Sequence, residues 1–387
     1  MADEHEYPRF SDAEFARRHA AVRERMGRAD LDALVIYGHG LAGSQVQYLT
    51  NWPVTVEAYL LFPRAGEMAM WVHFVNHAPL ARRASIVPDV QWRGVDAAET
   101  VAAALRKRGL ERAGIGVAGP LTFLTYEGLQ RRLPDARFVP FNQAFTELFL
   151  VKSEEELEWA RRGSELGDLA MEALEREVRP GLTEHDLAAI VQGAYLPKGG
   201  RNIIHFMSTT PMRAPDVAMP AQYQSHRVIQ RGDVLITEIS AHYWGYGGQS
   251  LRPYAIGEEP TDEYRRMYEI AEQAFYAVSK ALHTGARPAD VIAAADMIED
   301  AGYTIYDDLV HGMNNGYLPP VLRTRGTTVE EAPESFRYPE NSLWVVQPNI
   351  ITRDERMGLQ LGDMVRVTAN GGERMHRYPL KFVQCAT

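Results

Sequence analysis

The pattern of strands and helices changes near residue 150, and this change limits the folds open to the chain. In the first part, short apolar strands such as Leu34–Tyr37 alternate with helical stretches such as Val101–Arg108. At Ser153 a Ser-Glu-Glu-Glu segment forms a capping box, in which a serine and a glutamate three residues later satisfy the first turn of a helix. We therefore predict an α/β domain over residues 1–150 and a second domain over residues 151–387.

The second part is predicted to be an α+β domain. Amphipathic stretches over about 153–178, 261–283 and 289–301 indicate helices, because apolar residues recur every three or four positions. Runs such as Val234–Ile239 and Leu343–Val346 are instead typical of buried strands. Helix pairs laid on a curved antiparallel sheet would fit this order of elements.

Composition excludes several classes of protein. The chain of 387 residues carries a formal net charge of −10, with 41 Lys and Arg against 51 Asp and Glu. Phosphate recognition needs clustered cationic side chains, so we expect no nucleic-acid partner. No apolar run reaches the roughly 18–20 residues that span a bilayer, so we expect no membrane partner. The single cysteine, Cys385, cannot form a disulfide framework or a cysteine-based zinc site. Together these features predict a cytoplasmic protein.

Seven short motifs follow one another in the second part of the chain. They are Lys152–Arg161, Arg227–Glu238, Gly245–Arg252, Gly285–Val291, Val310–Gly312, Val345–Ile350 and Gly362–Gly371. In this order they resemble the pita-bread family, which contains creatinase, aminopeptidase P and methionine aminopeptidase. Residues 1–150 resemble the creatinase-type N-terminal domain more weakly, with Asn51-Trp52 as the best local match. The resemblance implies a pita-bread fold for residues 151–387 and a homodimer.

The resemblance also identifies the positions at which the family's metalloenzymes hold two divalent ions. Those enzymes use two Asp, one His and two Glu, because hard cations need anionic oxygen ligands. The corresponding positions here are Glu238, Gln249, His311, Gln347 and Gly362. Two carboxylates are replaced by neutral amides and one ligand is lost, so we expect neither a metal nor another cofactor. A mononuclear site of Glu238 and His311, with or without His226, stays open as an alternative.

Creatinase works without a metal, so the loss of ligands points to that branch of the family. However, the catalytic His and Glu of that branch correspond to Ala221 and Leu251 here, and we do not expect the creatinase reaction itself. We predict a metal-independent enzyme that hydrolyses a C–N bond, other than a peptide bond, in a small polar molecule. A lyase that catalyses β-elimination and a non-catalytic binding protein derived from a metallopeptidase remain alternatives.

Four residues are candidates for acid–base catalysis. His311 lies in a polar, glycine-rich segment, and an imidazole titrates near neutrality, which suits proton transfer. A structural role is its alternative. Glu238 interrupts an apolar strand, where a carboxyl group is costly to bury alone, and it could be a base, a nucleophile or the partner of a buried cation. His205 and His226 flank the loop before this strand, and each could replace the family's missing histidine.

Four further residues are candidates for substrate binding. The amides of Gln249 and Gln347 could orient a carbonyl or carboxylate group, or they could only fill space. Arg252 could clamp a carboxylate with two hydrogen bonds, or it could form an internal salt bridge. Tyr246 belongs to an aromatic, polar hairpin that could form one wall of a site, or it could serve packing.

Overall fold

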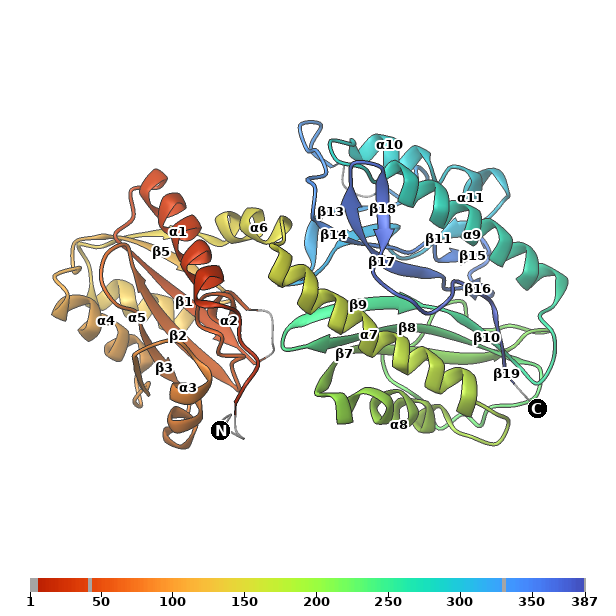
Figure 1. The fold of residues 1–387 in the computed structure, drawn as a ribbon, viewed down its shortest axis with the longest axis horizontal. Coiled ribbons are helices and arrows are strands. Elements are labelled where there is room, and N and C mark those ends of the chain that lie inside the picture. The colour runs from red at the N-terminus through yellow and green to blue at the C-terminus, as the bar shows by residue number, and fades with distance from the viewer. Residues whose placement is uncertain (1–5, 41–43, 329–331, 386–387) are drawn as a thin grey trace. The chain divides into compact units, whose positions relative to one another are not determined.

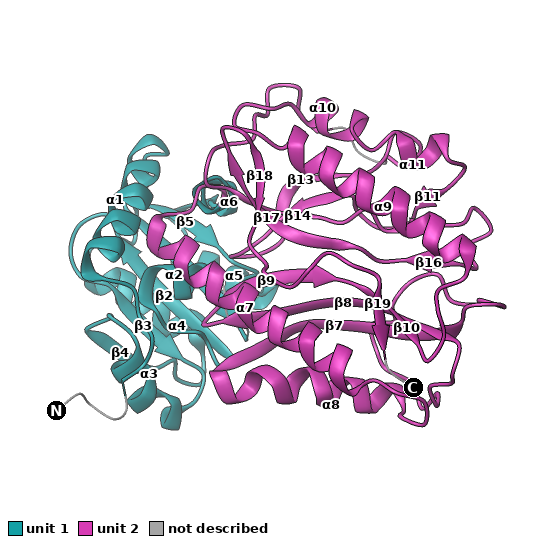
Figure 2. Ribbon diagram, turned by 45° about the vertical axis from the view of Figure 1, so that its right-hand side comes forward, with its two compact units in different colours: residues 1–149 teal, residues 150–387 magenta. Residues whose placement is uncertain are grey.

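Two units divide the chain in the computed structural model, which describes residues 6–40, 44–328 and 332–385 (Figure 2). Unit 1 covers Met1–Phe149 and unit 2 covers Leu150–Thr387. Within the described ranges, no helix is both long and apolar enough to cross a membrane.

The described part of unit 1 contains a six-stranded mixed sheet with the order β4-β3-β2-β1-β5-β6 (Figure 1). Strand β2 is antiparallel to both of its neighbours, and the other neighbouring strands are parallel. The strands are β1 (Ala33–His39), β2 (Glu57–Pro63), β3 (Ala69–Val72), β4 (Asp89–Trp92), β5 (Gly114–Ala118) and β6 (Arg137–Pro140). The helices are α1 (Asp12–Arg28), α2 (Gln45–Thr50), α3 (Ala78–Ala84), α4 (Ala97–Lys107), α5 (Phe123–Arg132) and α6 (Asn142–Leu150), with a 3-10 turn at Val75–His77. Val101 of α4 and Leu129 of α5 pack with Val35 of β1 in one buried cluster.

Unit 2 is built on a larger sheet that, among the described residues, has the order β13-β12-β14-β17-β9-β8-β10-β19. Strand β7 pairs with β8 and strand β18 pairs with β17. The strands are β7 (Gly200–Pro211), β8 (Asp233–Tyr243), β9 (Tyr246–Leu251), β10 (Pro253–Ile256), β12 (Val310–Gly312), β13 (Leu318–Leu322), β14 (Leu343–Val346), β17 (Gly362–Thr368), β18 (Gly371–Arg374) and β19 (Val383–Cys385). A separate small sheet joins β11 (Thr304–Ile305), β15 (Ile350–Ile351) and β16 (Gly358–Leu359).

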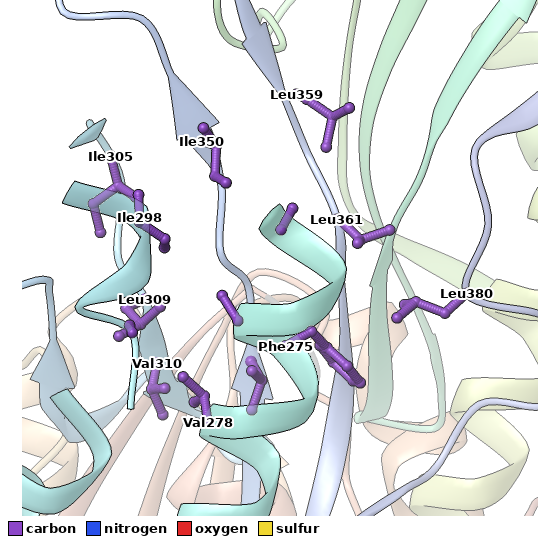
Figure 3. Close-up of a cluster of buried hydrophobic side chains, with 14 of the residues drawn as sticks. Phe275, Val278, Ile298, Ile305, Leu309, Val310, Ile350, Leu359, Leu361 and Leu380 are labelled. Atoms are coloured by element: carbon purple, nitrogen blue, oxygen red, sulfur yellow. The ribbon is translucent and has the colours of Figure 1, made fainter. Parts of the chain in front are cut away.

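Two groups of helices cover the sheet of unit 2 (Figure 1). The helices are α7 (Glu154–Glu177), α8 (Glu184–Tyr195), α9 (Asp262–Ala281), α10 (Pro288–Ala293) and α11 (Met297–Asp300), with a 3-10 turn at Leu196–Lys198. Helices α7 and α8 share a buried cluster with Leu235 and Ile239 of β8. Helices α9 to α11 share a second buried cluster with β12, β14 and β17. Figure 3 shows Phe275 and Val278 of α9 in this cluster, with Val278 beside Val310.

The observed architecture confirms the predicted fold class, an α/β unit followed by an α+β unit of helix pairs on a largely antiparallel sheet. The predicted capping box is also present, because Ser153 accepts from the backbone of Glu156 while the Glu156 side chain accepts from that of Ser153. This cap fixes the start of α7, the long helix that crosses β8 and β9.

Candidate active site

Strand register brings polar side chains of β8 and β9 together. Side chains alternate between the two faces of a strand, and Ile239 of β8 packs in the core with α7 and α8. Glu238 and Ser240 therefore point to the opposite face. Gln249 of β9 lies directly opposite Ser240 in the ladder, so its side chain reaches that same face.

These side chains form one hydrogen-bonded network with a residue of β12 and with the residue that follows β14. Ser240 Oγ donates to Gln249 Oε1 at 3.1 Å. Gln249 Nε2 donates to Glu238 Oε1 at 3.0 Å and to Gln347 Oε1 at 2.8 Å. A further side-chain hydrogen bond joins Gln347, which directly follows β14, to His311 of β12. We call these five residues the Glu238 network, and four of them were predicted as site residues from the sequence.

Glu238 is the acid of this network, and its surroundings disfavour the ionised form. Its side chain is 6% exposed. Burial, followed by the charges of Asp307 and Asp308, raises its pKa to about 8. At neutral pH the carboxyl group is therefore mostly protonated, and near pH 8 it can both give and take a proton.

His311 is buried as a neutral imidazole. Burial lowers its pKa to about 4, against the raising effects of its hydrogen bonds to Gly312 and Gln347. Its ring stacks on Tyr317 with 4.4 Å between the ring centroids. At neutral pH His311 can therefore donate and accept hydrogen bonds in the network without adding a charge.

Asp307 and Asp308, which were not among the predicted site residues, act on the network through their charge, which raises the pKa of Glu238. Burial raises the pKa of Asp307. Burial and the charge of Asp307 raise the pKa of Asp308 to about 6, although Arg323 acts in the opposite direction. The signal in the sequence is a pair of carboxylates shortly before His311. Because both affect Glu238, the three carboxyl groups influence one another's protonation.

Two histidines predicted to be catalytic, His205 and His226, lie outside the Glu238 network. His205 of β7 is directly opposite Ile239 in the ladder, so its side chain points away from Glu238, and its Nε2 shares a hydrogen bond of 2.7 Å with the Tyr195 hydroxyl group. His226 is exposed and packs edge-to-face on His185, with 4.7 Å between the ring centroids. Strand alternation and loop position thus exclude both residues from the network.

Two residues predicted to bind substrate make internal contacts, which agree with the alternatives of a salt bridge for Arg252 and packing for Tyr246. Arg252 is fully buried, forms a salt bridge with Asp363 and donates to four backbone carbonyl groups. Its donors are therefore not available to a substrate. The hydroxyl group of Tyr246 donates to Glu156 at 2.8 Å, and its ring packs on Trp159 of α7. Tyr246 therefore connects β9 to the first turns of α7.

Gly362, the fifth position that the family uses for a metal ligand, has no room for a side chain. A Cβ atom there would lie 2.4 Å from the Val346 carbonyl oxygen and 3.0 Å from the Cβ atom of Gln347. The strand would have to move before any carboxylate could stand at this position. Across the described residues, no group of three or more His, Cys, Asp or Glu side chains is arranged to hold a metal ion.

Comparisons with known protein families match both units. Residues 158–369 match the family described as "Metallopeptidase family M24". Residues 18–148 match the family described as "Creatinase/Prolidase N-terminal domain".

Similar proteins are named as peptidases. The Xaa-Pro dipeptidase of Pyrococcus furiosus is 26% identical over 268 residues, which cover 67% of this chain and 73% of the relative. The solved prolidase of Pyrococcus horikoshii superposes with a TM-score of 0.78 at 20% identity, covering 95% of this chain and 99% of the other. The solved X-Pro aminopeptidase of Thermotoga maritima superposes with a TM-score of 0.81 at 19% identity, covering 95% of this chain and 99% of the other. At these identities the two structures show the fold alone.

These comparisons overturn the function predicted from the sequence. A metal-independent hydrolase of a non-peptide C–N bond conflicts with a match to a metallopeptidase family and with relatives named for cleaving Xaa-Pro peptides. The prediction was wrong because it followed the creatinase branch on the strength of the missing ligands, whereas the relatives that the chain resembles are hydrolytic peptidases.

Proposed function

Because this chain belongs to metallopeptidase family M24 and carries a creatinase/prolidase N-terminal domain, we propose that it is a hydrolase that cleaves peptide bonds in short peptides. The observation that supports this proposal is the convergence of Glu238, Gln249, Gln347 and His311 in one buried network. The relatives named Xaa-Pro dipeptidase make Xaa-Pro dipeptides the first substrates to test.

The network contains the acid–base function that peptide hydrolysis needs. A base must take a proton from the attacking water, and an acid must give a proton to the leaving nitrogen. The ionised fraction of Glu238 can do both in turn, because its carboxylate accepts the proton and the resulting acid returns it, and this fraction grows as the pH rises towards its pKa of about 8. Gln249 holds this carboxyl group by donating to it, while neutral His311 and Gln347 can hydrogen-bond the substrate.

The donor set does not fit the pair of metal ions that the family description implies. Of the five matched positions, only Glu238 and His311 retain a strong metal-ligating group. Gln249 and Gln347 are hydrogen-bonded to each other. At Gly362 the Val346 carbonyl oxygen leaves no space for a side chain. Two close divalent ions need shared anionic oxygens, which amides do not supply. We therefore assign the proton transfers to Glu238 and no step to a metal.

The test is a peptidase assay on the full chain with a panel of dipeptides and tripeptides, with and without proline in the second position. Each reaction is run with a chelator and with added Mn²⁺. We expect cleavage by the wild type and a loss of roughly 100-fold or more in Glu238→Gln, the usual scale for removal of a general base. The matched control is Glu269→Gln, an exposed position on α9.

Two results would contradict the proposal. One is the absence of cleavage by the wild type for every peptide under both metal conditions. The other is cleavage that Glu238→Gln leaves intact, which would separate the activity from the Glu238 network.

We also propose that the chain works as a homodimer in the cytoplasm. The support is the resemblance to the pita-bread family and the single, buried cysteine. Sedimentation equilibrium at several concentrations tests the oligomeric state, and a molecular mass equal to one chain at all of them would contradict the dimer.

A further inference from the structure

Two buried amide side chains, those of Asn349 and Gln360, have polar atoms without partners. Each side chain is 1% exposed. Among the described residues, Nδ2 and Oδ1 of Asn349 and Oε1 of Gln360 are buried without a hydrogen-bond partner. A buried polar atom that gives up water and gains no partner is unfavourable. These three atoms therefore indicate a place for a polar group of a ligand.

Alternation along the chain places Gln360 on the face that carries the catalytic network. Leu359 and Leu361 both pack in the apolar cluster with α9 (Figure 3), so Gln360 between them points to the opposite face. Gly362 lies on that opposite face too, because a Cβ atom there would be 3.0 Å from the Cβ atom of Gln347. Gln347 is a member of the network. Gln360 thus shares a face with it.

Strand register places Asn349 beside both of these glutamines. The ladder of β14 and β17 and the ladder of β15 and β16 share one register. Continued between them, this register sets Asn349 opposite Gln360 and Gln347 opposite Gly362. Ile350 packs in the cluster with α9, so Asn349 before it points to the other face. Directly opposite residues have Cβ atoms about 5 Å apart, which puts the two amides within reach of one ligand group. We call Asn349 and Gln360 the amide subsite.

The unpaired atoms of the amide subsite select the chemical class of its ligand. Nδ2 of Asn349 is a donor, whereas the two amide oxygens are acceptors. A carboxylate group has no donor and would leave both oxygens unpaired. An ammonium group has no acceptor and would leave Nδ2 unpaired. A carboxamide or peptide group carries a carbonyl acceptor and an N–H donor, so it pairs with both kinds of atom.

We propose that the amide subsite binds the carboxamide or peptide group that follows the cleaved bond of a peptide substrate. The carbonyl oxygen accepts from Asn349 Nδ2, and the N–H group donates to Asn349 Oδ1 or to Gln360 Oε1. The chain therefore prefers peptides that continue past this position, or that end in a carboxamide, to dipeptides that end in a carboxylate. This inference rests on the proposed peptidase function for its substrate, but the binding chemistry can be measured without any cleavage.

Binding is tested by isothermal titration of the full chain with N-acetylprolinamide, N-acetylproline methyl ester and N-acetylproline. The amide and the ester are both uncharged, but only the amide has an N–H donor at this group. The double variant Asn349→Leu/Gln360→Met keeps side chains of similar size and removes the unpaired atoms, so the fold is expected to survive. Gln273→Met, at an exposed position on α9, is the matched control.

We expect the wild type and Gln273→Met to bind the amide at least roughly tenfold more tightly than the ester or the acid. The double variant should bind the amide and the ester about equally. Equal binding of amide and ester by the wild type would overturn the proposal, and this comparison depends on no substitution. So would the absence of saturable binding of every probe, or an amide preference that survives in the double variant.

Cleavage is a separate measurement on the wild type, with the peptides Ala-Pro, Ala-Pro carboxamide and Ala-Pro-Ala. We expect kcat/KM to be roughly tenfold higher for at least one of the last two than for Ala-Pro. A gain for the carboxamide alone identifies a terminal carboxamide as the ligand group, and a gain for Ala-Pro-Ala identifies a peptide group. Equal kcat/KM for all three would overturn the amide subsite and leave the peptidase proposal standing. Amide-selective binding without cleavage of any peptide would contradict the peptidase proposal and support the amide subsite.

Discussion

At the scale of single residues, Glu238 links the site to the pH dependence of stability. Its pKa in the folded chain is about 8, whereas the ordinary value is 4.5. The folded chain therefore keeps a proton that the unfolded chain releases, and stability falls as the pH rises from about 4.5 to about 8. We expect Glu238→Gln to be more stable than the wild type at pH 9, by roughly 2 kcal/mol or more, and similar to it at pH 4.

Urea unfolding at the two pH values measures this difference. Glu269→Gln on the exposed face of α9 is the control and should match the wild type at both. Equal stability of Glu238→Gln and wild type at pH 9 would show that the carboxyl group is not held in its protonated form.

Gly362 allows a second prediction at the same scale. A Cβ atom would lie 2.4 Å from the Val346 carbonyl oxygen, so Gly362→Ala must displace β14 or β17. We expect a loss of about 1–3 kcal/mol in the free energy of unfolding, the usual cost of overpacking. Gly193→Ala inside α8 is the contrasting variant, because no atom lies within 4 Å of the new Cβ atom. We expect it to raise the free energy of unfolding by roughly 0.5–1 kcal/mol. Thermal unfolding of both variants measures the contrast, and a Gly362→Ala variant as stable as wild type would contradict it.

At the scale of elements, one buried ion-pair cluster joins three strand segments. Asp363 of β17 binds Arg252, which lies between β9 and β10, and Arg374 of β18. Asp363 and Arg252 are both fully buried. Removing one partner leaves buried charge without compensation, so we expect Asp363→Asn to lose about 3–5 kcal/mol.

The exposed pair of Arg287 and Asp290 is the matched control for this prediction. Asp290→Asn should change stability by less than about 1 kcal/mol, because solvent screens such pairs. Denaturant unfolding compares the two variants. If Asp363→Asn were as mild as Asp290→Asn, the cluster would not hold the strands together.

Local patterns predicted the elements better than they predicted the site. The capping box at Ser153 and the strand over Val234–Ile239 follow from neighbouring residues and are present. One helix was predicted over 289–301, but the structure has α10 and α11, because the N–H groups of Ala295 and Asp296 bond to carbonyl groups three residues back.

The placement of His205 outside the network follows from register, which is a property of strand pairs and not of local sequence. His205 is near Glu238 in the sheet, yet it pairs with Ile239, so a shift of one position puts its side chain on the other face. The convergence of Gln249 with Gln347, separated by 98 positions, could be predicted only by resemblance to a family of known fold.

At the scale of the whole molecule, the apolar core of unit 2 and the Glu238 network are built from different residues. The buried apolar clusters of unit 2 contain no member of the Glu238 network. The fold is kept at low sequence identity, as the TM-score of 0.78 to a prolidase at 20% identity shows. The two amides and the closed position at Gly362 predict that the stability of the wild type does not depend on a metal ion.

The effect of metal ions on the stability of the wild type can be measured. If the folded wild type binds no metal, its unfolding temperature stays within about 1 °C on addition of a chelator or of Mn²⁺, because only a bound ligand can stabilise the folded state. The variant Gln249→Asp/Gln347→Glu restores two carboxylates beside Glu238 and His311. It should be less stable than wild type with chelator, since it adds buried charge, and it should gain about 2.7 kcal/mol when Mn²⁺ is present at 100 times its dissociation constant. A wild type that gained as much stability from Mn²⁺ as this variant would show that the amide network is itself a metal site.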